Sequence, residues 1–481
     1  MMVRVRYAPS PTGHIHVGNA RTAIFNYLFA RHEGGTFIMR LDDTDLERST
    51  EENIDSMLED IRWLGLEWDE GFLKGGDLGP YRQSERKPLY DKYLQQLLNE
   101  GKAYRCFCTK DELEAEHRKA EAEHRIYRYS GACAHLSQEQ IDNNLREGKP
   151  YAIRLRIPEQ DVLVHDLIRG DVQFKSEEFD DFVIARQNGI PIYNFATVID
   201  DALMKITHII RAEEHLSNTP RQVFIYRALG FDVPQFAHVS LILAPDHSKL
   251  SKRHGAVSVG DYRFEGYLPE ALVNYLVLLG WSPKDDREFF TMDELIREFT
   301  LDGIGKSGAV FDKKKLTWMN HMYMSRKSAD DILTILKTDF ANQYSEAFAG
   351  LPDEKVREAI DLIKGNAQVL PDIFRLARNI VQPDVIITDE KSQAVLASPE
   401  AKVVLQYLVE HFDAIPFGRG DEAMSAWVED LRNQIPLPAK KLYHPIRVAL
   451  FGTKDGPEIV KLFMALERNN IRDRLNKALT Q

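Results

Sequence analysis

The first hundred residues alternate between short apolar segments of period two and one longer segment of helical period. Residues 3–7 alternate apolar and basic side chains, which predicts a β-strand. Residues 8–13 are rich in turn formers, residues 19–31 carry a broad apolar face at helix spacing, and residues 36–41 are again apolar. Strand, helix and strand in this order indicate a βαβ unit, and hence a parallel sheet covered by helices.

This alternation of strand and helix patterns changes between residues 104 and 190. The stretch holds a highly charged helical segment at residues 111–124 and an extended segment at residues 151–157. We interpret it as an α+β domain inserted in the parallel sheet. The βα pattern then resumes, with a strand predicted at residues 205–211, a helix at 220–229 and a strand at 238–243.

Beyond about residue 257 the chain becomes mainly helical. Apolar residues recur at helix spacing near residues 332–336, 356–363 and 459–466. Such stripes are typical of packing inside helical bundles and carry no functional information by themselves.

Composition narrows the class of protein. The chain of 481 residues is 43% hydrophobic and 28% charged, with a net charge of −12. With domains of about 100–200 residues, this length predicts three or more domains. No run of about 18 apolar residues predicts a membrane span, and the first residues lack the apolar core of a signal peptide. Three cysteines argue against a disulfide scaffold, so we expect a cytoplasmic protein.

Residues 9–19 form the first of two segments that carry chemistry. They lie between the first predicted strand and the first predicted helix, where unpaired N–H groups at a helix N-terminus can receive phosphate. Gly18 would let the backbone or a base approach closely, and His16 could donate a hydrogen bond to a phosphate oxygen. Taken alone, His16 would be read as an ordinary structural histidine.

The second segment is a basic loop, Lys249-Leu250-Ser251-Lys252-Arg253-His254-Gly255, which follows the predicted strand at residues 238–243. Such a loop can fold over a triphosphate and neutralise the charge that builds up during adenylyl transfer. In isolation, its four basic side chains would simply form a solvated surface.

Together the two segments resemble the split active site of class I aminoacyl-tRNA synthetases. His16-Val17-Gly18-Asn19 is similar to the HIGH motif, with Asn19 in place of the last histidine, and Lys249-Leu250-Ser251-Lys252-Arg253 is similar to the KMSKS motif. The resemblance implies catalytic roles for His16, Lys249 and Lys252. It also implies an ATP site, with Mg²⁺ on the phosphates, formed by His16, Gly18, Asn19, Glu214, Lys249, Ser251, Lys252 and Arg253.

Four further blocks resemble bacterial glutamyl-tRNA synthetases, namely residues 6–13, 42–45, 80–86 and 211–215. The similarity runs from the N-terminus to about residue 320. It implies that L-glutamate attacks the α-phosphorus of ATP, and that the glutamyl-adenylate then reacts with the terminal ribose of tRNA-Glu. In this family, activation characteristically waits for bound tRNA. The resemblance also implies a monomer.

The substrate sets the chemistry of the amino acid site. A side-chain carboxylate calls for a guanidinium, which grips two oxygens at once, and an amino group calls for a carboxylate or another polar acceptor. By position in the family, the glutamate site would be formed by Arg6, Ala8, Ser10, Asp42, Tyr193 and Arg211. Asp42 would face the amino group, where many relatives carry the longer glutamate. Without the family, Arg6 and Arg211 would be read as structural or surface arginines.

All three cysteines of the chain stand in the inserted stretch. Cys106-Phe107-Cys108 is followed after a gap of 24 residues by Cys133-Ala134-His135. These two pairs suit a tetrahedral, structural Zn²⁺ held by Cys106, Cys108, Cys133 and His135. The alternative is three buried thiols and an unrelated histidine. Some members of the family carry a comparable set in the domain that meets the tRNA 3′ end.

The resemblance also divides the chain by function. A Rossmann-like catalytic domain is expected at residues 1–103 and 191–245, with the zinc-binding, tRNA acceptor-binding domain at residues 104–190. A stem-contact region that carries the KMSKS-like loop would span residues 246–325. Mainly α-helical anticodon-binding domains would form residues 326–481.

A basic cluster near this last boundary suits tRNA phosphates, although a plain solvated face has the same composition. It consists of Lys306, Lys313, Lys314, Lys315, Arg326 and Lys327. Trp318 within it could stack on a base, but we expect it in the core.

Three other enzymes and one non-enzyme share parts of this pattern. An enzyme that glutamylates a modified base of tRNA-Asp would lack the C-terminal helical region, and a glutaminyl-tRNA synthetase would carry a β-barrel there. A small-molecule nucleotidyltransferase would be shorter. A tRNA-binding paralogue without activity is disfavoured because His16, Lys249, Lys252 and Arg211 are all present.

Overall fold

The computed structural model describes residues 2–44, 49–387 and 389–480. Asp45, the last residue of the block at residues 42–45, therefore lies outside the described residues. The chain divides into two compact units. The N-terminal unit comprises residues 1–261 and 273–311, and the C-terminal unit comprises residues 262–272 and 312–481. Within the described residues, no helix is both long and apolar enough to cross a membrane.

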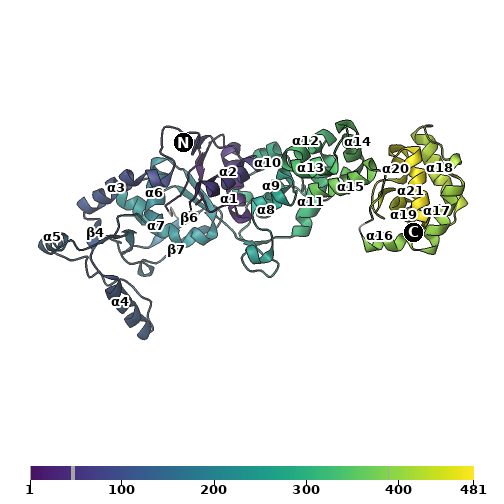
Figure 1. Ribbon diagram of the computed structural model, residues 1–481. Coiled ribbons are helices and arrows are strands. Elements are labelled where there is room, and N and C mark those ends of the chain that lie inside the picture. The colour runs from purple at the N-terminus through teal and green to yellow at the C-terminus, as the bar shows by residue number, and fades with distance from the viewer. Residues whose placement is uncertain (1, 45–48, 388, 481) are drawn as a thin grey trace. The chain divides into compact units, whose positions relative to one another are not determined.

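The strands and helices are labelled in chain order (Figure 1). The strands are β1 (Arg4–Tyr7), β2 (Thr36–Met39), β3 (Glu70–Gly71), β4 (Ala103–Cys106), β5 (Ala152–Leu155), β6 (Val162–Asp166), β7 (Gly170–Phe174), β8 (Val183–Ala185), β9 (His208–Ala212), β10 (Gln235–Val239), β11 (Ile242–Leu243) and β12 (Ala309–Val310). The helices of the first part are α1 (Val17–His32), α2 (Glu51–Trp63), α3 (Lys87–Asn99), α4 (Lys110–Ala122), α5 (Gln138–Arg146), α6 (Tyr193–Leu203), α7 (Thr219–Leu229), α8 (Val259–Phe264), α9 (Pro269–Leu278) and α10 (Met292–Glu298). Those of the second part are α11 (Lys313–Arg326), α12 (Ala329–Asp339), α13 (Ala341–Ala347), α14 (Asp353–Ile363), α15 (Leu370–Val381), α16 (Glu390–Leu396), α17 (Pro399–Glu410), α18 (Asp421–Gln434), α19 (Ala439–Phe451), α20 (Ile459–Ala465) and α21 (Arg468–Thr480).

The N-terminal unit is built on two sheets that adjoin through β1 and β9. In the first sheet, β1, β2 and β3 are parallel and lie in this order. The second sheet has the order β7-β6-β10-β9, in which β6, β10 and β9 are parallel and β7 is antiparallel. Thr207, just before β9, accepts a hydrogen bond from the Arg4 amide (2.8 Å) and donates its own amide to the Arg4 carbonyl (2.9 Å). The predicted parallel-sheet fold is confirmed.

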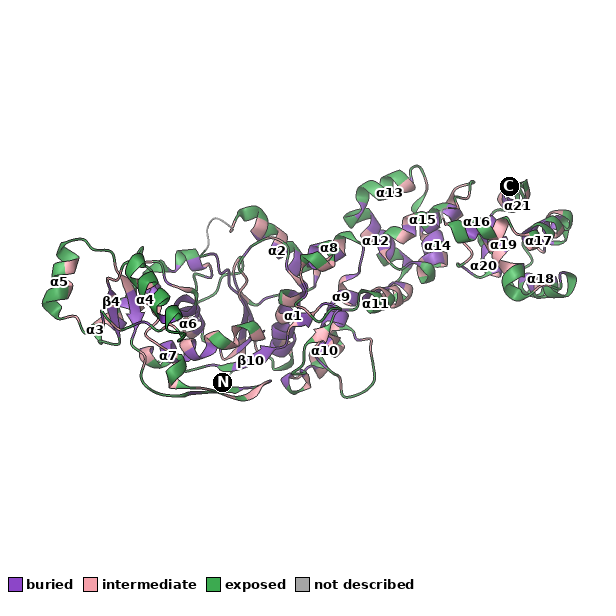
Figure 2. Ribbon diagram, turned by 90° about the horizontal axis from the view of Figure 1, so that it is seen from below, coloured by how far each residue is buried: buried purple, intermediate pink, exposed green. Residues whose placement is uncertain are grey.

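Helix α1 packs against these two sheets along most of its length. Its side chains are mainly apolar and buried, and the Asn26 amide donates to the Ile210 carbonyl in β9 (3.0 Å). In contrast, α4 and α5 in the inserted stretch are largely exposed (Figure 2). In that stretch β4, β5 and β8 form an antiparallel sheet, while β6 and β7 belong to the sheet of β9 and β10.

Two predicted strands differ from the structure for local reasons. The strand expected at residues 205–211 begins only at His208, because Lys205 adopts a positive φ of 56°. The strand expected at residues 238–243 is divided into β10 and β11. Between them the Ser240 carbonyl accepts a hydrogen bond from Arg21 and the Leu241 amide donates to the Glu213 carboxylate, so neither group is available to a neighbouring strand.

The C-terminal unit is helical, as predicted. The apolar stripes of α12 and α14 lie in one core that extends to α19, α20 and α21. Ile332, Leu336, Val356 and Ile360 are fully buried in it. These stripes therefore pack the helices together.

A network of buried charged side chains links α6 to neighbouring elements of the N-terminal unit. Asp200 in α6 accepts hydrogen bonds from Arg86 Nε (2.5 Å), Gln83 Nε2 (2.8 Å) and the Tyr90 hydroxyl (2.9 Å). Arg40 donates to Asp201 (2.6 Å), the next residue of the same helix. A buried charge that loses its partner is strongly destabilising, so each of these side chains depends on the others.

We predict that Asp200→Ala lowers the free energy of unfolding of the N-terminal unit by about 3–5 kcal/mol, because it leaves the Arg86 guanidinium buried and uncompensated. Urea denaturation measures the effect. Asp171→Ala is the matched control, since Asp171 pairs with His165 on the surface and its loss should change stability by less than about 0.5 kcal/mol. Equal effects of the two substitutions would contradict the assignment.

Candidate active site

Main-chain pairing brings the His16 segment and the basic loop together. The Val17 amide donates to the Val257 carbonyl, and the Val259 amide donates to the Ile15 carbonyl, both at 2.8 Å. His16 thereby forms an antiparallel bridge with Ser258. The loop at residues 249–255 precedes this bridge by a few residues, so it is held at the N-terminus of α1.

A cavity of about 330 Å³ lies where the two segments meet. All of the predicted ATP-binding residues except Arg253 line it, namely His16, Gly18, Asn19, Glu214, Lys249, Ser251 and Lys252. Ala212 at the end of β9 and Ser240, directly after β10, also line it. Ligands of open parallel sheets bind at these carboxyl ends, so the position suits a nucleotide.

His16 is the N-cap residue of α1. Its Nδ1 accepts a hydrogen bond from the Gly18 amide (3.1 Å), which leaves Nε2 to carry the proton of a neutral ring. A Cβ atom at Gly18 would lie 3.3 Å from Nδ1, so a glycine keeps this contact free of crowding. Burial, and then the positive charge of Lys249, lower the pKa of His16. His16 is therefore a neutral hydrogen-bond donor at the N-terminus of α1.

The lysines of the loop face an acidic partner across the cavity. Lys249 forms an ion pair with Glu214, which follows β9. Lys252 lines the same cavity, whereas Arg253 turns back on its own loop and donates to the Ser248 hydroxyl (3.0 Å). The cavity thus carries positive charge at one side.

Arg21 is a cavity residue that the sequence analysis missed. It is only 2% exposed, and its guanidinium donates to the carbonyls of Ser240 and Leu279 (3.1 Å to the latter). Burial lowers its pKa to about 10. The available clue was that Arg21 stands one residue from Ala20 and two from Ala23, in the first turns of a helix with a broad apolar face.

Arg211, at the end of β9, is a buried cation held by neutral groups. It is 5% exposed and donates to His238 Nε2 (3.1 Å) and to the Thr219 hydroxyl (2.8 Å). Its Nη1 is buried and has no hydrogen-bond partner within the described chain. Burial, and the nearby charge of Arg6, lower the pKa of Arg211. A buried donor without a partner, on an uncompensated charge, suits an anionic ligand.

Arg6 and Asp42 are already engaged with other side chains. Arg6 donates to Asp201 (3.1 Å), and Asp42 accepts from Arg40 Nε (2.7 Å). Burial raises the pKa of Asp42 to about 6, against the opposing effect of Arg40. The Asp42 carboxylate is thus engaged by Arg40. This disfavours a direct contact between Asp42 and the amino group of the substrate.

The other predicted glutamate residues border this region. Tyr193 opens α6 and its ring centroid lies 5.9 Å from that of His215. Ala8 and Ser10 lie in the turn after β1, where Ser10 is exposed. The pKa of His215 falls to about 4 because of burial and of the Arg211 charge, so this ring is neutral.

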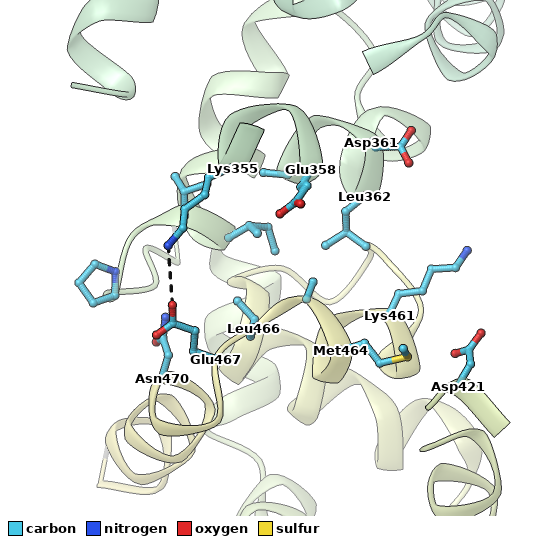
Figure 3. A pocket seen from close by; sticks show the side chains of 15 residues that line it. Lys355, Glu358, Asp361, Leu362, Asp421, Lys461, Met464, Leu466, Glu467 and Asn470 are labelled. Atoms are coloured by element: carbon cyan, nitrogen blue, oxygen red, sulfur yellow. Dashed lines mark ion pairs between the residues drawn. The ribbon is translucent and has the colours of Figure 1, made fainter. Parts of the chain in front are cut away.

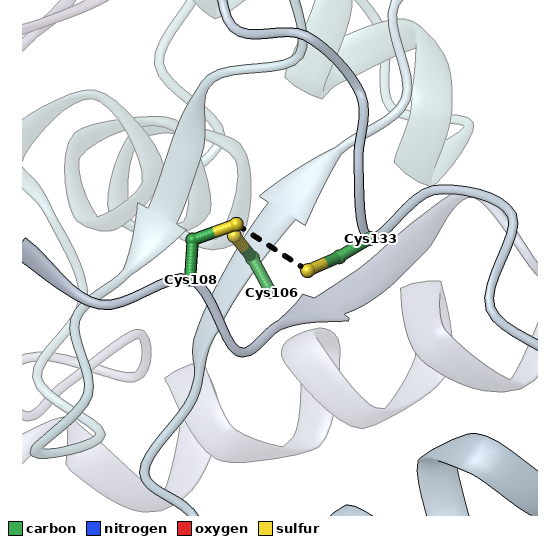
Figure 4. Close-up of side chains that lie close together, drawn as sticks. All are labelled: Cys106, Cys108 and Cys133. Carbon is green, nitrogen blue, oxygen red and sulfur yellow. Dashed lines mark hydrogen bonds between the residues drawn. The ribbon is translucent and has the colours of Figure 1, made fainter. Parts of the chain in front are cut away.

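The three cysteines gather in the inserted stretch (Figure 4). The sulfurs of Cys106, Cys108 and Cys133 all lie within 4.8 Å of one another, and those of Cys108 and Cys133 are 3.5 Å apart. Zn–S bonds of about 2.3 Å place the sulfurs of a tetrahedral site about 3.8 Å apart, so the group fits a metal.

His135 does not join this group. It is exposed, whereas the Tyr129 hydroxyl lies 3.4 Å from the Cys106 sulfur and 3.6 Å from the Cys108 sulfur. The same hydroxyl accepts a hydrogen bond from the Cys133 amide (3.0 Å). Tyr129 was missed because a tyrosine four residues before a cysteine has no distinctive spacing.

A larger cavity, of about 790 Å³, lies within the C-terminal unit (Figure 3). Lys355 and Glu467 form an ion pair across it at 3.7 Å. Four carboxylates and two lysines line it, namely Glu358, Asp361, Asp421, Glu467, Lys355 and Lys461. Its acidic balance disfavours a nucleotide phosphate, so cavity size does not identify the active site here.

Trp318 does not lie in the core, contrary to expectation. It is 43% exposed on α11 and borders a cavity of about 630 Å³ together with Lys313, Lys314 and His321. The opposite wall is formed by residues 365–368. An exposed aromatic face beside lysines is typical of surfaces that bind single-stranded nucleic acid.

Comparison with known proteins agrees with this geometry. Residues 2–318 match the family described as tRNA synthetases class I (E and Q), catalytic domain, and residues 327–479 match the family described as anticodon binding domain. The glutamate–tRNA ligase of Carboxydothermus hydrogenoformans is 45% identical over 468 residues, which cover 97% of each chain. Glutamate–tRNA ligase 1 of Caldanaerobacter subterraneus is 46% identical and covers 99% of this chain and 97% of its own.

A solved structure is similar over the full length of both chains. The crystal structure of a glutamate tRNA ligase from Elizabethkingia meningosepticum in complex with its amino acid has a TM-score of 0.87 at 37% identity and covers 100% of each chain. A second, from Elizabethkingia anophelis, has a TM-score of 0.85 at 36% identity. The chain therefore belongs to the glutamate–tRNA ligase family of class I tRNA synthetases.

Proposed function

We propose that this chain activates L-glutamate with ATP and transfers it to the 3′ end of tRNA-Glu, as a cytoplasmic monomer. The observation that carries the proposal is the meeting of His16, Lys249 and Lys252 around one cavity at the carboxyl ends of the parallel strands. Within β9, near its carboxyl end, the same unit offers Arg211 as an uncompensated guanidinium for a dicarboxylic substrate.

In the first step, the glutamate α-carboxylate attacks the α-phosphorus of ATP and the bond to the pyrophosphate oxygen breaks. No covalent enzyme intermediate is needed, so the protein contributes alignment and charge stabilisation. The neutral His16 ring donates a hydrogen bond to a phosphate oxygen. Lys249 leaves Glu214 and, with Lys252, neutralises charge on the departing pyrophosphate, while Mg²⁺ on the phosphates would supply further positive charge.

In the second step, a hydroxyl of the terminal tRNA ribose attacks the carbonyl carbon of the mixed anhydride, and AMP leaves. The helical region at residues 326–481 would bind the anticodon, and the inserted stretch would meet the acceptor end. Cys106, Cys108 and Cys133, with the Tyr129 hydroxyl, would hold a structural zinc ion that cross-links the inserted stretch.

The direct test is ATP–pyrophosphate exchange with glutamate, glutamine or aspartate, with and without tRNA. We expect exchange with glutamate and tRNA only. Lys249→Ala should lower kcat at least about 100-fold, because a charge that acts in the transition state is lost. Lys74→Ala, an exposed lysine paired with Glu67, is the matched control and should retain full activity. Exchange that prefers glutamine, or that ignores Lys249, would overturn the proposal.

For the metal, we predict about one zinc equivalent per chain by elemental analysis, because three thiolates and a phenol oxygen complete a tetrahedral set. Cys133→Ser should lose the zinc, and His135→Ala should keep it, since His135 is exposed and outside the sulfur cluster. A metal-free, fully active wild-type preparation would refute the zinc site. Loss of zinc in His135→Ala would show that His135, and not Tyr129, is the fourth zinc ligand.

For the Trp318 surface, we predict that Trp318→Ala raises the KM for tRNA roughly tenfold, because base stacking contributes about 1–3 kcal/mol. The KM values for ATP and glutamate at saturating tRNA should not change. Trp318→Phe retains a stacking face and should remain near wild type. An unchanged tRNA KM in the alanine variant would show that this surface does not stack on tRNA.

A further inference from the structure

Three buried polar side chains lie in a row across neighbouring strands of the catalytic sheet. Asp166 ends β6, His238 lies in β10 and Arg211 lies in β9, and the register places His238 directly beside Arg211. The three are 4%, 0% and 5% exposed, respectively. Buried polar groups at such depth are retained only with defined hydrogen bonds, so the order of donors and acceptors along the row can be worked out.

The Asp166 carboxylate sets the tautomer of His238. It accepts hydrogen bonds from His238 Nδ1 (2.6 Å) and from the amides of Ile168 (3.0 Å) and Arg169 (2.8 Å). Burial of Asp166 would raise its pKa, but these bonds prevail and lower it, so Asp166 is an anion that only accepts. The proton of the neutral imidazole therefore sits on Nδ1 and Nε2 presents a lone pair.

That lone pair meets the Arg211 guanidinium. Arg211 Nε donates to His238 Nε2 at 3.1 Å, and Arg211 Nη2 donates to the Thr219 hydroxyl at 2.8 Å. Nη2 also donates to the His215 carbonyl (3.4 Å), so all of these acceptors are neutral, and they occupy one edge of the guanidinium. Nη1 remains buried and without a partner in the described chain.

Three other buried arginines of this unit have a different kind of partner. Arg6, Arg40 and Arg86 each bind an aspartate directly. A direct carboxylate neutralises a guanidinium, whereas a neutral imidazole orients it and leaves its charge for another anion. Among the described residues, no carboxylate lies within ion-pair distance of Arg211.

We propose that Asp166 and His238 are positioning residues, which hold the Arg211 guanidinium in one orientation and leave it unneutralised for the side-chain carboxylate of glutamate. This inference rests on the proposed function. The proposed arrangement also links the substrate site to the inserted stretch, because Asp166 is the last residue of β6. Arg169, three residues later, donates to the His238 carbonyl (3.2 Å) and to the Glu213 carboxylate.

Two substitutions of His238 separate orientation from simple packing. In His238→Asn the amide stands where Nδ1 was, so it still reaches Asp166 but not Arg211; in His238→Gln the amide reaches the Nε2 position and can accept from Arg211. We expect the asparagine variant to raise the KM for glutamate at least about tenfold, as for loss of a hydrogen bond to a charged group. The glutamine variant should stay within a few fold of wild type, and kcat and the KM for ATP should change little in both.

Asp166→Asn is the second variant, for use if His238→Asn does not fold. Its amide can donate to Nδ1 and move the ring proton to Nε2, which would then oppose the Arg211 donor, so the KM for glutamate should again rise about tenfold. Exchange by the wild type with glutamate and tRNA is the reference; its absence would end the proposed function itself. With an active wild type, an unchanged glutamate KM in Asp166→Asn, or equal losses in the Asn and Gln variants of His238, would overturn the positioning role alone.

Discussion

Two main-chain hydrogen bonds, between residues 15–17 and residues 257–259, form the contact on which the site depends. They join the N-terminus of the first helix to the segment that follows the basic loop. Neither half is a nucleotide site by itself, because the helix end supplies donors but little charge and the loop supplies charge without a fixed position. Joined, they enclose one cavity whose donors and cations face the same space. The chemistry is therefore a property of the sheet topology, which delivers both segments to the same strand ends.

A second constraint is the placement of buried charge. The N-terminal unit buries several guanidinium groups, and those of Arg6, Arg40 and Arg86 are compensated by aspartates of α6. Arg211 belongs to a second group, whose hydrogen bonds go to neutral acceptors: Arg211 donates to an imidazole, a hydroxyl and a carbonyl, and Arg21 donates to two carbonyls. An uncompensated buried charge costs stability, so its presence is best understood as a requirement of binding. We propose that the fold holds the Arg211 charge for a substrate anion.

Much of the fold could be predicted because periodicity is local. Strand, helix and strand near the N-terminus and the stripes of α12 and α14 are encoded by neighbouring residues. That the two short motifs line one cavity was predictable for a different reason, since the residues of each motif are neighbours in the chain. In contrast, the contact of Tyr129 with the sulfurs depends on how distant segments pack, and no spacing rule reports it. The exposure of Trp318 was equally invisible, because it is set by tertiary neighbours rather than by local sequence.

The most direct measurement is a crystal structure of the chain with glutamate and a non-hydrolysable ATP analogue. The account predicts phosphate oxygens within hydrogen-bond distance of His16 Nε2 and of the Lys249 or Lys252 ammonium groups. It also predicts the glutamate side-chain carboxylate on Arg211 Nη1. A nucleotide bound elsewhere, with Lys249 still paired to Glu214 and Nη1 of Arg211 without the substrate, would contradict it.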